Sequence, residues 1–274
     1  MAETDADSPL APLVAAWSSA ADDVLALTAA LDDEAMATPT DLPGWTVQDV
    51  LAHLAALEAE LAGDPLLEVP DDALPSDALA NPFKAHTERG VAARRGRSAA
   101  QVQAELASAV ERRRTALAAD LPSDPNAPAA GVAEETWSWE TLLRNRVIDL
   151  WMHEQDIRRA VGRPGGFDTL GAQVTVMSFA VAMPFVLGRR VKPASGAVVR
   201  WRVGEGADAW DVAVRMDDDG RARVVGSDVP ADAEILMTTE DFVCACGGRR
   251  EVSPAITGDT DLARRVLESM AVTP

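Results

Sequence analysis

The chain has very few residues of the types that supply nucleophiles and metal ligands. Its 274 residues include three histidines, two cysteines and no tyrosine. The cysteines, Cys244 and Cys246, are separated by one residue, which is the spacing of neither a zinc knuckle nor a Cys-x-x-Cys redox pair. We therefore expect two reduced thiols packed among other side chains, because free cysteine is usually buried. Any chemistry based on imidazole must rest on three positions.

Positive charge and long apolar runs are also scarce. The formal net charge is -19 and the pI is near 4.5, and such a chain is repelled by nucleic acid and by anionic membranes. The longest apolar run, residues 174–188, is shorter than the ~20 residues of a membrane span and contains Pro184. The opening MAETDADSPL lacks the basic and apolar regions of a secretory signal. We expect a soluble, cytoplasmic protein that binds neither nucleic acid nor membrane.

What the chain does have is a hydrophobic content of 47%, and the period of its apolar residues changes near residue 195. Before this point they recur at helical spacing. This pattern predicts helices over residues 8–31, 46–61, 83–121 with a break near 95–97, 138–161 and 170–190. The second helix has the clearest start, because Thr46 and Asp49 fit a capping box and Trp45 and Val50 fit a hydrophobic staple.

After residue 195 apolar and polar residues alternate, as they do in half-buried strands. In residues 198–203 valine and tryptophan alternate with two arginines, and residues 210–216 show the same period. The sequence DDDGR signals a hairpin turn, and a further strand and two short helices follow it. The fold class is therefore α+β and multidomain, with a helical bundle over residues 1–190 and a smaller α+β domain over residues 195–274.

The helix predicted over residues 138–161 carries a polar stripe. On a helical wheel of about 100° per residue, four polar residues share one side: Arg146, Asp149, His153 and Asp156. Apolar residues border this stripe on both edges, and the ordinary solvated face lies opposite. A stripe between apolar walls is expected to point inward, where charged groups need partners.

A divalent metal is one such partner. Asp149 and His153 are one helical turn apart and project side by side, and helical bundles build metal sites from facing helices. His53, on the apolar face of the second helix, is the natural third ligand. Two histidines and one carboxylate leave coordination positions open, as in a catalytic site. The same residues also fit plainer roles, namely a buried core histidine at position 53 and a helix-surface pair of Asp149 with His153.

The remaining polar candidates have simpler interpretations. His86 has no carboxylate or histidine at a telling spacing and is interpreted as a surface or core residue. Asp49 lies one turn before His53, but the capping box explains it. Because the net charge is strongly negative, an anionic substrate would have to be recognised locally. Three arginines on the predicted strands are candidates for this, although they also fit a solvent-facing role: Arg200, Arg202 and Arg215.

Two segments, LPGWTVQDVLAHL and RVIDLWMHEQDIRRAVGRPGG, resemble the mycothiol-dependent maleylpyruvate isomerase family, and GDTDLARRVLESMAVTP resembles the end of that family's C-terminal domain. The resemblance covers nearly the whole chain. It implies an N-terminal DinB-like four-helix bundle and a C-terminal domain similar to sterol carrier proteins. It also implies a metal site at His53, Asp149 and His153. The family usually has glutamate where this chain has Asp149, which is one methylene shorter.

The resemblance further implies a divalent metal, zinc or else nickel, and the small-molecule thiol mycothiol as cofactors. A metal-bound thiolate would attack a small electrophilic substrate, giving isomerisation if the thiolate leaves again and S-transfer if it stays attached. Arg146 and Asp156 would orient the ligands and balance their charge. Two alternatives stay open: a small-molecule-binding protein of the same fold without catalytic activity, and a metal-dependent hydrolase that needs no thiol.

Overall fold

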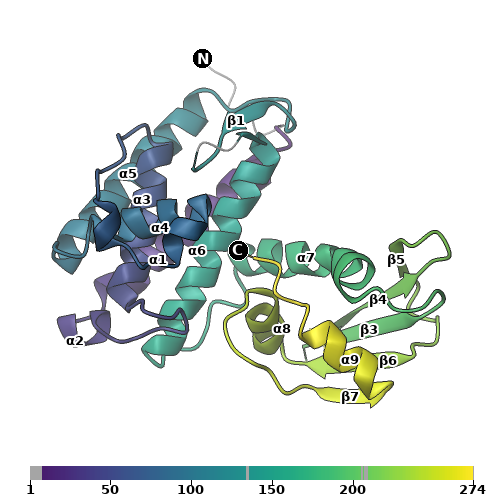
Figure 1. The fold of residues 1–274 in the computed structure, drawn as a ribbon. Coiled ribbons are helices and arrows are strands. Elements are labelled where there is room, and N and C mark those ends of the chain that lie inside the picture. Colours follow the sequence, from purple (N-terminus) through teal and green to yellow (C-terminus); the bar gives the residue numbers. More distant parts are fainter. Residues whose placement is uncertain (1–7, 134–135, 205, 207–208, 274) are drawn as a thin grey trace. The chain divides into compact units, whose positions relative to one another are not determined.

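A computed structural model describes residues 8–133, 136–204, 206 and 209–273. Most of the segment examined for a secretory signal, residues 1–7, lies outside the described residues. The chain divides into two compact units, Met1–Val174 and Thr175–Pro274. The first is helical and the second is built around a sheet (Figure 1), which confirms the predicted α+β class. The division falls inside a helix, and the domain bounds near residues 190–195 stay a prediction.

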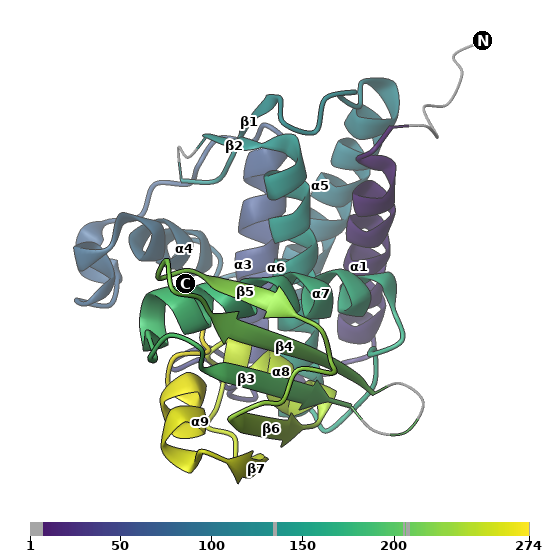
Figure 2. The ribbon, with the colours of Figure 1, turned by 90° about the vertical axis from the view of Figure 1, so that its right-hand side faces the viewer.

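The helical unit is built on four long helices that lie side by side in Figure 2: α1 (Ala11–Ala29), α3 (Val47–Leu61), α5 (Ala99–Ala119) and α6 (Trp139–Ala160). α1 and α3 each pack against both α5 and α6. Shorter helical segments complete the unit: α2 (Asp33–Met36), η1 (Asp71–Ala73), η2 (Ala78–Ala80) and α4 (Pro82–Ala92). The break predicted near residues 95–97 is confirmed, because α4 and α5 are separate helices.

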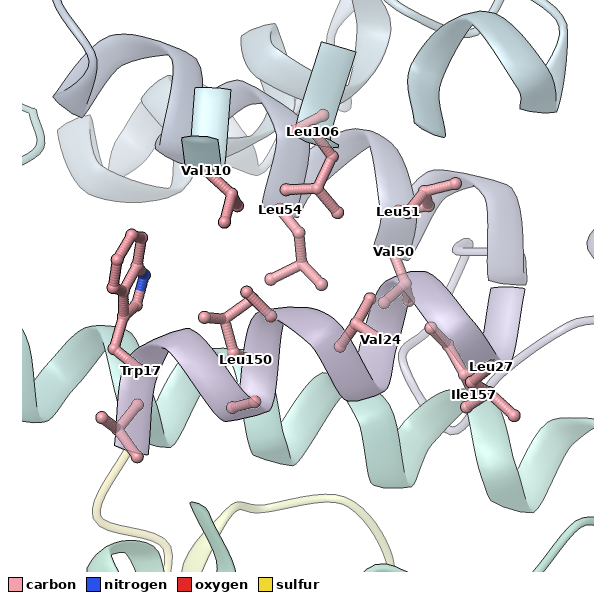
Figure 3. Packing of buried hydrophobic residues seen from close by; sticks show 14 of the residues in the cluster. Trp17, Val24, Leu27, Val50, Leu51, Leu54, Leu106, Val110, Leu150 and Ile157 are labelled. Carbon is pink, nitrogen blue, oxygen red and sulfur yellow. The ribbon is translucent and has the colours of Figure 1, made fainter. Parts of the chain in front are cut away.

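Large apolar side chains fill the space between the four helices (Figure 3). Trp17 of α1, Leu54 of α3 and Leu150 of α6 are each fully buried in this cluster. Burial of one such side chain stabilises the fold by about 1.5–3 kcal/mol. The apolar contacts therefore fix which faces of α3 and α6 turn inward, and the polar residues on those faces are buried with them.

The start of α3 follows from its local sequence. The Thr46 hydroxyl accepts a hydrogen bond from the Asp49 backbone N–H, and the Asp49 carboxylate accepts one from the Thr46 backbone N–H. This is the predicted capping box. Because the cap fixes the first turn, it also sets the rotation at which His53 emerges two turns further along.

One segment of the helical unit differs from expectation. Residues 121–131 were expected to form a loop, but β1 (Pro128–Ala130) pairs antiparallel with β2 (Thr136–Ser138). Strands of three residues are too short to show a period of two in the sequence. The sequence pattern therefore gave no signal for this pair of strands.

The helix predicted over residues 170–190 is confirmed, and it continues through Pro184. α7 (Leu170–Phe185) contains Pro184 and continues as the π-helix η3 (Val186–Val191), so the proline does not interrupt the helix. The missing N–H donor of proline is accommodated where the wider π turns begin. Residues 170–191 are long and apolar enough to cross a membrane by length and composition alone. This is weak evidence, because core helices of soluble proteins pass the same test.

The second unit contains a five-stranded sheet: β3 (Val198–Val203), β4 (Trp210–Met216), β5 (Ala222–Val225), β6 (Ala233–Met237) and β7 (Ala255–Gly258). The strand order is β5-β4-β3-β6-β7, with β3 and β6 parallel and all other pairs antiparallel. α8 (Thr239–Cys246) follows β6, and α9 (Thr260–Leu267) packs against β6 and β7. The predicted strands and the DDDGR hairpin are confirmed, whereas β7 had not been expected.

Arg200 does not face solvent, contrary to the simple alternation along β3. Its side chain is 8% exposed and donates hydrogen bonds to Glu234 and to the backbone oxygens of Ser227 and Val229. Arg200 therefore holds the loop before β6 against the sheet. Arg202 and Arg215 are exposed, and each forms an ion pair with a carboxylate of the same unit.

Candidate metal centre

Helices α3 and α6 pack against each other so that His53 meets Asp149 and His153. One ligand atom from each of these residues lies within 4.8 Å of the other two. Across the described residues, no other group of three histidine, cysteine or carboxylate side chains comes together in this way. The three residues selected from the sequence therefore form a single cluster, although His53 and Asp149 are 96 residues apart along the chain.

The distances within this cluster suit a bound ion better than a pair of hydrogen bonds. His53 Nε2 lies 3.3 Å from either oxygen of Asp149, and His153 Nε2 lies 3.4 Å from Oδ1. Charge-assisted N–H···O bonds are about 2.7–2.9 Å long. Donor atoms about 2.0–2.1 Å from a tetrahedral zinc ion lie roughly 3.3 Å apart. The shorter aspartate thus reaches both histidines, and the donor set fits a divalent metal.

The two histidines of the cluster are buried more deeply than its carboxylate. The side chains of His53 and His153 are each 7% exposed, whereas that of Asp149 is 27% exposed. These three residues would hold an ion, and a ligand from outside the protein would complete its coordination. A site with three protein ligands and free positions is the arrangement of catalytic zinc.

The electrostatic environment shifts the pKa values of the two histidines in opposite directions. Burial lowers the pKa of His53 below its ordinary value, despite the attraction of Asp149. Burial acts in the same direction on His153, but Asp149 and Asp156 together raise its pKa. Burial opposes ionisation of Asp149, yet the charges of His53, Arg146 and His153 hold the pKa of Asp149 well below 3.8. A carboxylate ionised at neutral pH and a neutral imidazole at position 53 are the forms that bind a metal.

Arg146 fixes the carboxylate ligand. Its Nη1 donates to Asp149 Oδ2 at 2.8 Å, and its Nε donates to Glu58 Oε1 at 2.9 Å. Glu58 is fully buried and also accepts hydrogen bonds from Trp17 Nε1 and Arg113. The guanidinium of Arg146 therefore connects a buried carboxylate in the core with the carboxylate of the cluster. Arg146 is buried, as the polar stripe predicts, and its role at a metal site stays a prediction.

Asp156 fixes one of the imidazole ligands. His153 Nδ1 lies 2.9 Å from Asp156 Oδ2, and Asp156 is fully buried. Arg159 donates to the other oxygen of Asp156 at 2.5 Å and to Asp41 at 2.6 Å. A histidine that donates one N–H to a carboxylate presents its other nitrogen, here Nε2, as a free lone pair. Asp156 therefore sets the tautomer that a metal ligand requires.

His53 has no equivalent partner. Its Nε2 is turned toward Asp149, and its Nδ1 is buried without a hydrogen-bond partner among the described residues. Metal-bound histidines almost always donate this second N–H to a carboxylate, a carbonyl or water. The two histidines of the cluster are thus unequally supported.

One residue that borders the cluster, Trp45, was not predicted from the sequence. The Trp45 ring lies 5.2 Å from the His53 ring and 6.1 Å from the His153 ring, measured between centroids. Trp45 Nε1 donates to Glu88, a buried residue of α4. The sequence predicts only that Trp45 packs against Val50 in a hydrophobic staple, because these two residues are close along the chain. A contact with residue 153 depends on tertiary packing and has no signal in the local sequence.

His86 has a carboxylate partner that its spacing in the sequence does not reveal. His86 Nε2 lies 2.7 Å from Glu60 Oε2, and both side chains are mostly buried. The two residues come from α4 and α3 and are 26 positions apart, so no local spacing announces the pair. Asp49 keeps its capping role, and its carboxylate also accepts a hydrogen bond from Arg95.

Both cysteines lie outside the cluster. Cys244 and Cys246 of α8 form no disulfide and are fully buried, as expected. Burial raises the pKa of Cys246 far above its ordinary range, so this thiol stays protonated. A protonated, buried thiol is a poor nucleophile, so Cys246 is poorly suited to react.

Residues 17–158, more than half of the chain, match the family model described as the mycothiol maleylpyruvate isomerase N-terminal domain. This stretch contains all three residues of the cluster. No curated protein matches the chain at a significant level.

Two solved structures share the fold. One is described as mycothiol-dependent maleylpyruvate isomerase, with 13% sequence identity and a TM-score of 0.58. The other is described as a mutant of mycothiol-dependent maleylpyruvate isomerase, with 14% identity and a TM-score of 0.57. Each comparison covers 93% of this chain and 96% of the other. At this level of identity the likeness establishes the fold over both units and nothing further.

Proposed function

The chain belongs to the mycothiol maleylpyruvate isomerase family, and on that premise we propose that it is a metal- and mycothiol-dependent isomerase or S-transferase. The observation that carries the proposal is the convergence of His53, Asp149 and His153 on one point. We further propose zinc, or else nickel, as the ion, a small electrophile as the substrate, and the cytoplasm as the location. The family relation also underlies our proposal of a sterol-carrier-like domain over residues 195–274.

When bound, the ion would lower the pKa of a coordinated thiol, so that the thiolate becomes available as a nucleophile. The chain's own residues prepare the site for it. Asp156 accepts the Nδ1 proton of His153, and Arg146 holds one oxygen of Asp149. Trp45 lies beside both imidazoles and is itself buried. The protein would thus orient three ligands, and the reactants would complete the coordination of the ion.

The exposure pattern supports thiol chemistry over a reaction of the chain's own nucleophiles. Both cysteines are buried, and the cluster contains only metal-binding groups. The bound thiol of a small cofactor would supply the missing nucleophile. Isomerisation and S-transfer share this first requirement and differ in whether the thiolate leaves the product.

Metal content is the first test, measured by inductively coupled plasma mass spectrometry on wild type, His53→Ala, His153→Ala and His86→Ala. We expect near-stoichiometric zinc or nickel in the wild type and in His86→Ala, and none in the other two variants. His86→Ala is the matched control, because it removes the one histidine that is outside the cluster. Equal metal in all four proteins, or none after loading with zinc, would contradict the proposed site.

Thiol consumption is the second test. The metal-loaded protein is mixed with mycothiol and a set of electrophiles, including a cis-enoyl diacid. We expect either a trans product with the thiol returned or a thioether with the thiol consumed. Metal loading without any thiol binding would favour a non-catalytic binding protein, and turnover of esters or amides without thiol would favour a hydrolase.

A further inference from the structure

One face of helix α4 is buried, and a glutamate lies on it. The buried residues of this helix are Ala85, Glu88 and Val91, which follow one another at intervals of three, and Glu88 is 7% exposed. Lys84, one turn before Glu88, is exposed and forms an ion pair with Asp77. A buried carboxylate costs free energy unless an opposite charge and hydrogen bonds compensate for it. Glu88 therefore needs compensation from elsewhere in the fold.

The other buried carboxylates have such compensation. The described residues include five buried carboxylates, all of them in the helical unit. Four of the five form an ion pair with arginine: Asp49 with Arg95, Glu58 with Arg113 and Arg146, Glu154 with Arg158, and Asp156 with Arg159. Glu88 is the exception, because no arginine, lysine or histidine among the described residues bonds to its carboxylate. Its negative charge is therefore unpaired.

A tryptophan holds Glu88 in place. Glu88 Oε1 accepts a hydrogen bond from Trp45 Nε1 at 3.1 Å, whereas Oε2 is buried without a hydrogen-bond partner among the described residues. Glu58 provides the contrast, because it also accepts a hydrogen bond from an indole, that of Trp17, but has two arginines as further partners. The indole N–H thus fixes the orientation of Glu88 without neutralising its charge.

The same tryptophan borders the metal cluster. Its ring lies 5.2 Å from the His53 ring and 6.1 Å from the His153 ring, measured between centroids. His53 Nδ1, like Glu88 Oε2, is buried without a hydrogen-bond partner among the described residues. Glu88 and both histidines of the cluster are therefore neighbours of one buried indole, and the unpaired charge lies close to the position proposed for a cation.

A divalent ion would supply the charge that Glu88 lacks. Asp149 is the one charged residue among the three proposed ligands, and Arg146 already pairs with its carboxylate. Two positive charges would therefore be only partly neutralised within the cluster. Because charges interact more strongly in buried surroundings than in water, a carboxylate on the other side of Trp45 would attract the ion.

We propose that Glu88 is a positioning residue of the metal centre, whose carboxylate is held by Trp45 and stabilises the bound cation through its charge. The proposal rests on the proposed function, which places a divalent ion at the cluster. Without the ion, the unpaired carboxylate destabilises the fold. With the ion, the same carboxylate strengthens metal binding. A residue with a purely structural role would instead stabilise the fold in both states.

Two measurements on Glu88→Gln of the full chain test the proposal: the zinc affinity, from competition with a chromophoric chelator, and urea unfolding of the chelator-treated protein. Glutamine keeps the shape of the side chain and an oxygen for the Trp45 N–H, so the charge is what is lost. We expect zinc affinity to fall about tenfold or more, as it does when a metal ligand loses its supporting carboxylate. The metal-free variant should unfold at a higher urea concentration than the wild type, because an unpaired buried charge is gone.

Glu111→Gln is the matched control, because it removes the same charge from an exposed position of α5. Its zinc affinity and its unfolding midpoint should equal those of the wild type. Trp45→Phe tests how Glu88 is held, since phenylalanine keeps a ring beside the imidazoles and removes the N–H donor. We expect Glu88→Gln to lower zinc affinity less in Trp45→Phe than in the wild type, because the two residues act as a unit.

The outcomes separate this proposal from the proposed function. Zinc affinity in Glu88→Gln equal to that of a zinc-binding wild type would overturn the role of Glu88 and leave the metal site intact. Loss of both zinc affinity and metal-free stability would also overturn it, because Glu88 would then be a structural residue. Equal effects of Glu88→Gln with and without the Trp45 N–H would overturn the role of Trp45. A wild type that takes up no zinc would overturn both proposals.

Discussion

The helical unit buries two polar clusters that share Arg146, and they differ in how completely their members are paired. In the first, both oxygens of Glu58 are bonded, to Trp17 and Arg146 on one side and to Arg113 on the other. In the second, two imidazoles face one carboxylate at 3.3–3.4 Å, and His53 Nδ1 has no partner among the described residues. A fully paired cluster can stabilise the packing of the helices that carry it. An incompletely paired cluster is kept in place by the surrounding fold, and its unpaired polar atoms are available to a ligand.

The same comparison bears on Asp149, where the resemblance predicts a glutamate. Arg146 is held by the core through Glu58 and meets Asp149 at 2.8 Å. Aspartate is one methylene shorter than glutamate and has one rotatable bond fewer. The hydrogen bond from Arg146 restricts the orientation of its carboxylate further. The structural cluster therefore acts as the support of the ligand cluster.

The largest expected effect comes from breaking the paired cluster. Glu58→Gln keeps the shape of the side chain but leaves Arg113 and Arg146 without their buried counter-charge. Removing one partner of a buried ion pair costs about 3–5 kcal/mol of unfolding free energy. Urea denaturation monitored by tryptophan fluorescence measures the loss.

The control for this change is Glu111→Gln on α5, because Glu111 is 72% exposed and lies 3.9 Å from Arg114. A surface change of this kind should alter stability by less than about 0.5 kcal/mol. If Glu58→Gln proved as stable as this control, the cluster around Glu58 would not stabilise the fold. The proposed difference between the two clusters would then be contradicted.

A smaller effect comes from removing the one carboxylate that supports a ligand of the second cluster. Asp156→Asn leaves His153 Nδ1–H without a charged acceptor. Loss of such a partner typically lowers metal affinity about 10–100-fold. Competition with a chromophoric zinc chelator measures the affinity.

Asp41→Asn is the matched control for Asp156→Asn. Asp41 binds the same arginine, Arg159, but has no contact with a histidine of the cluster. Zinc affinity should therefore be unchanged in this variant. An equal loss of zinc affinity in both variants would contradict this explanation. The loss would then come from the displacement of Arg159 at the end of α6, and not from the missing hydrogen bond to His153.

The two clusters also differ in how well they could be predicted from the sequence. The stripe of Arg146, Asp149, His153 and Asp156 is visible because its spacing is local and its apolar borders decide the inward direction. The capping box made the helical placement of His53 equally clear. These features depend on residues within a few positions of one another, where helical geometry leaves little freedom.

What the sequence could not show are the pairs that tertiary packing makes. Glu58 and Arg113 are 55 residues apart, and Glu60 and His86 are 26 apart. On a helical wheel Glu58 is one more acidic residue, and its complete burial depends on where α5 and α6 lie. Arg200 shows the same limit in the sheet, since alternation predicts its face but not the loop that covers it.

The smallest expected effect is a pH dependence of the unfolding free energy of the metal-free protein. It tests whether a proton on His153 stabilises the second cluster when no ion is bound. The pKa of His153 is raised above 6.5 in the folded chain by Asp149 and Asp156, against the effect of burial. The folded state therefore binds a proton more tightly than the unfolded chain at this site. The stability that this proton contributes is fully present below pH 6.5 and is lost as the pH rises through the folded pKa.

His53 contributes with the opposite sign and in a different window. Its folded pKa lies below 6.5, so it destabilises the fold only as the pH falls below that value. Above pH 6.5 the slope thus belongs to His153 alone among the cluster histidines. Urea unfolding of the chelator-treated protein between pH 6.5 and 9 should show stability falling with pH, and His153→Gln should flatten that fall. If the unfolding free energy of His153→Gln fell with pH as steeply as that of the wild type, the titrating group would be a residue other than His153. The second cluster would then make no contribution to the pH dependence of stability.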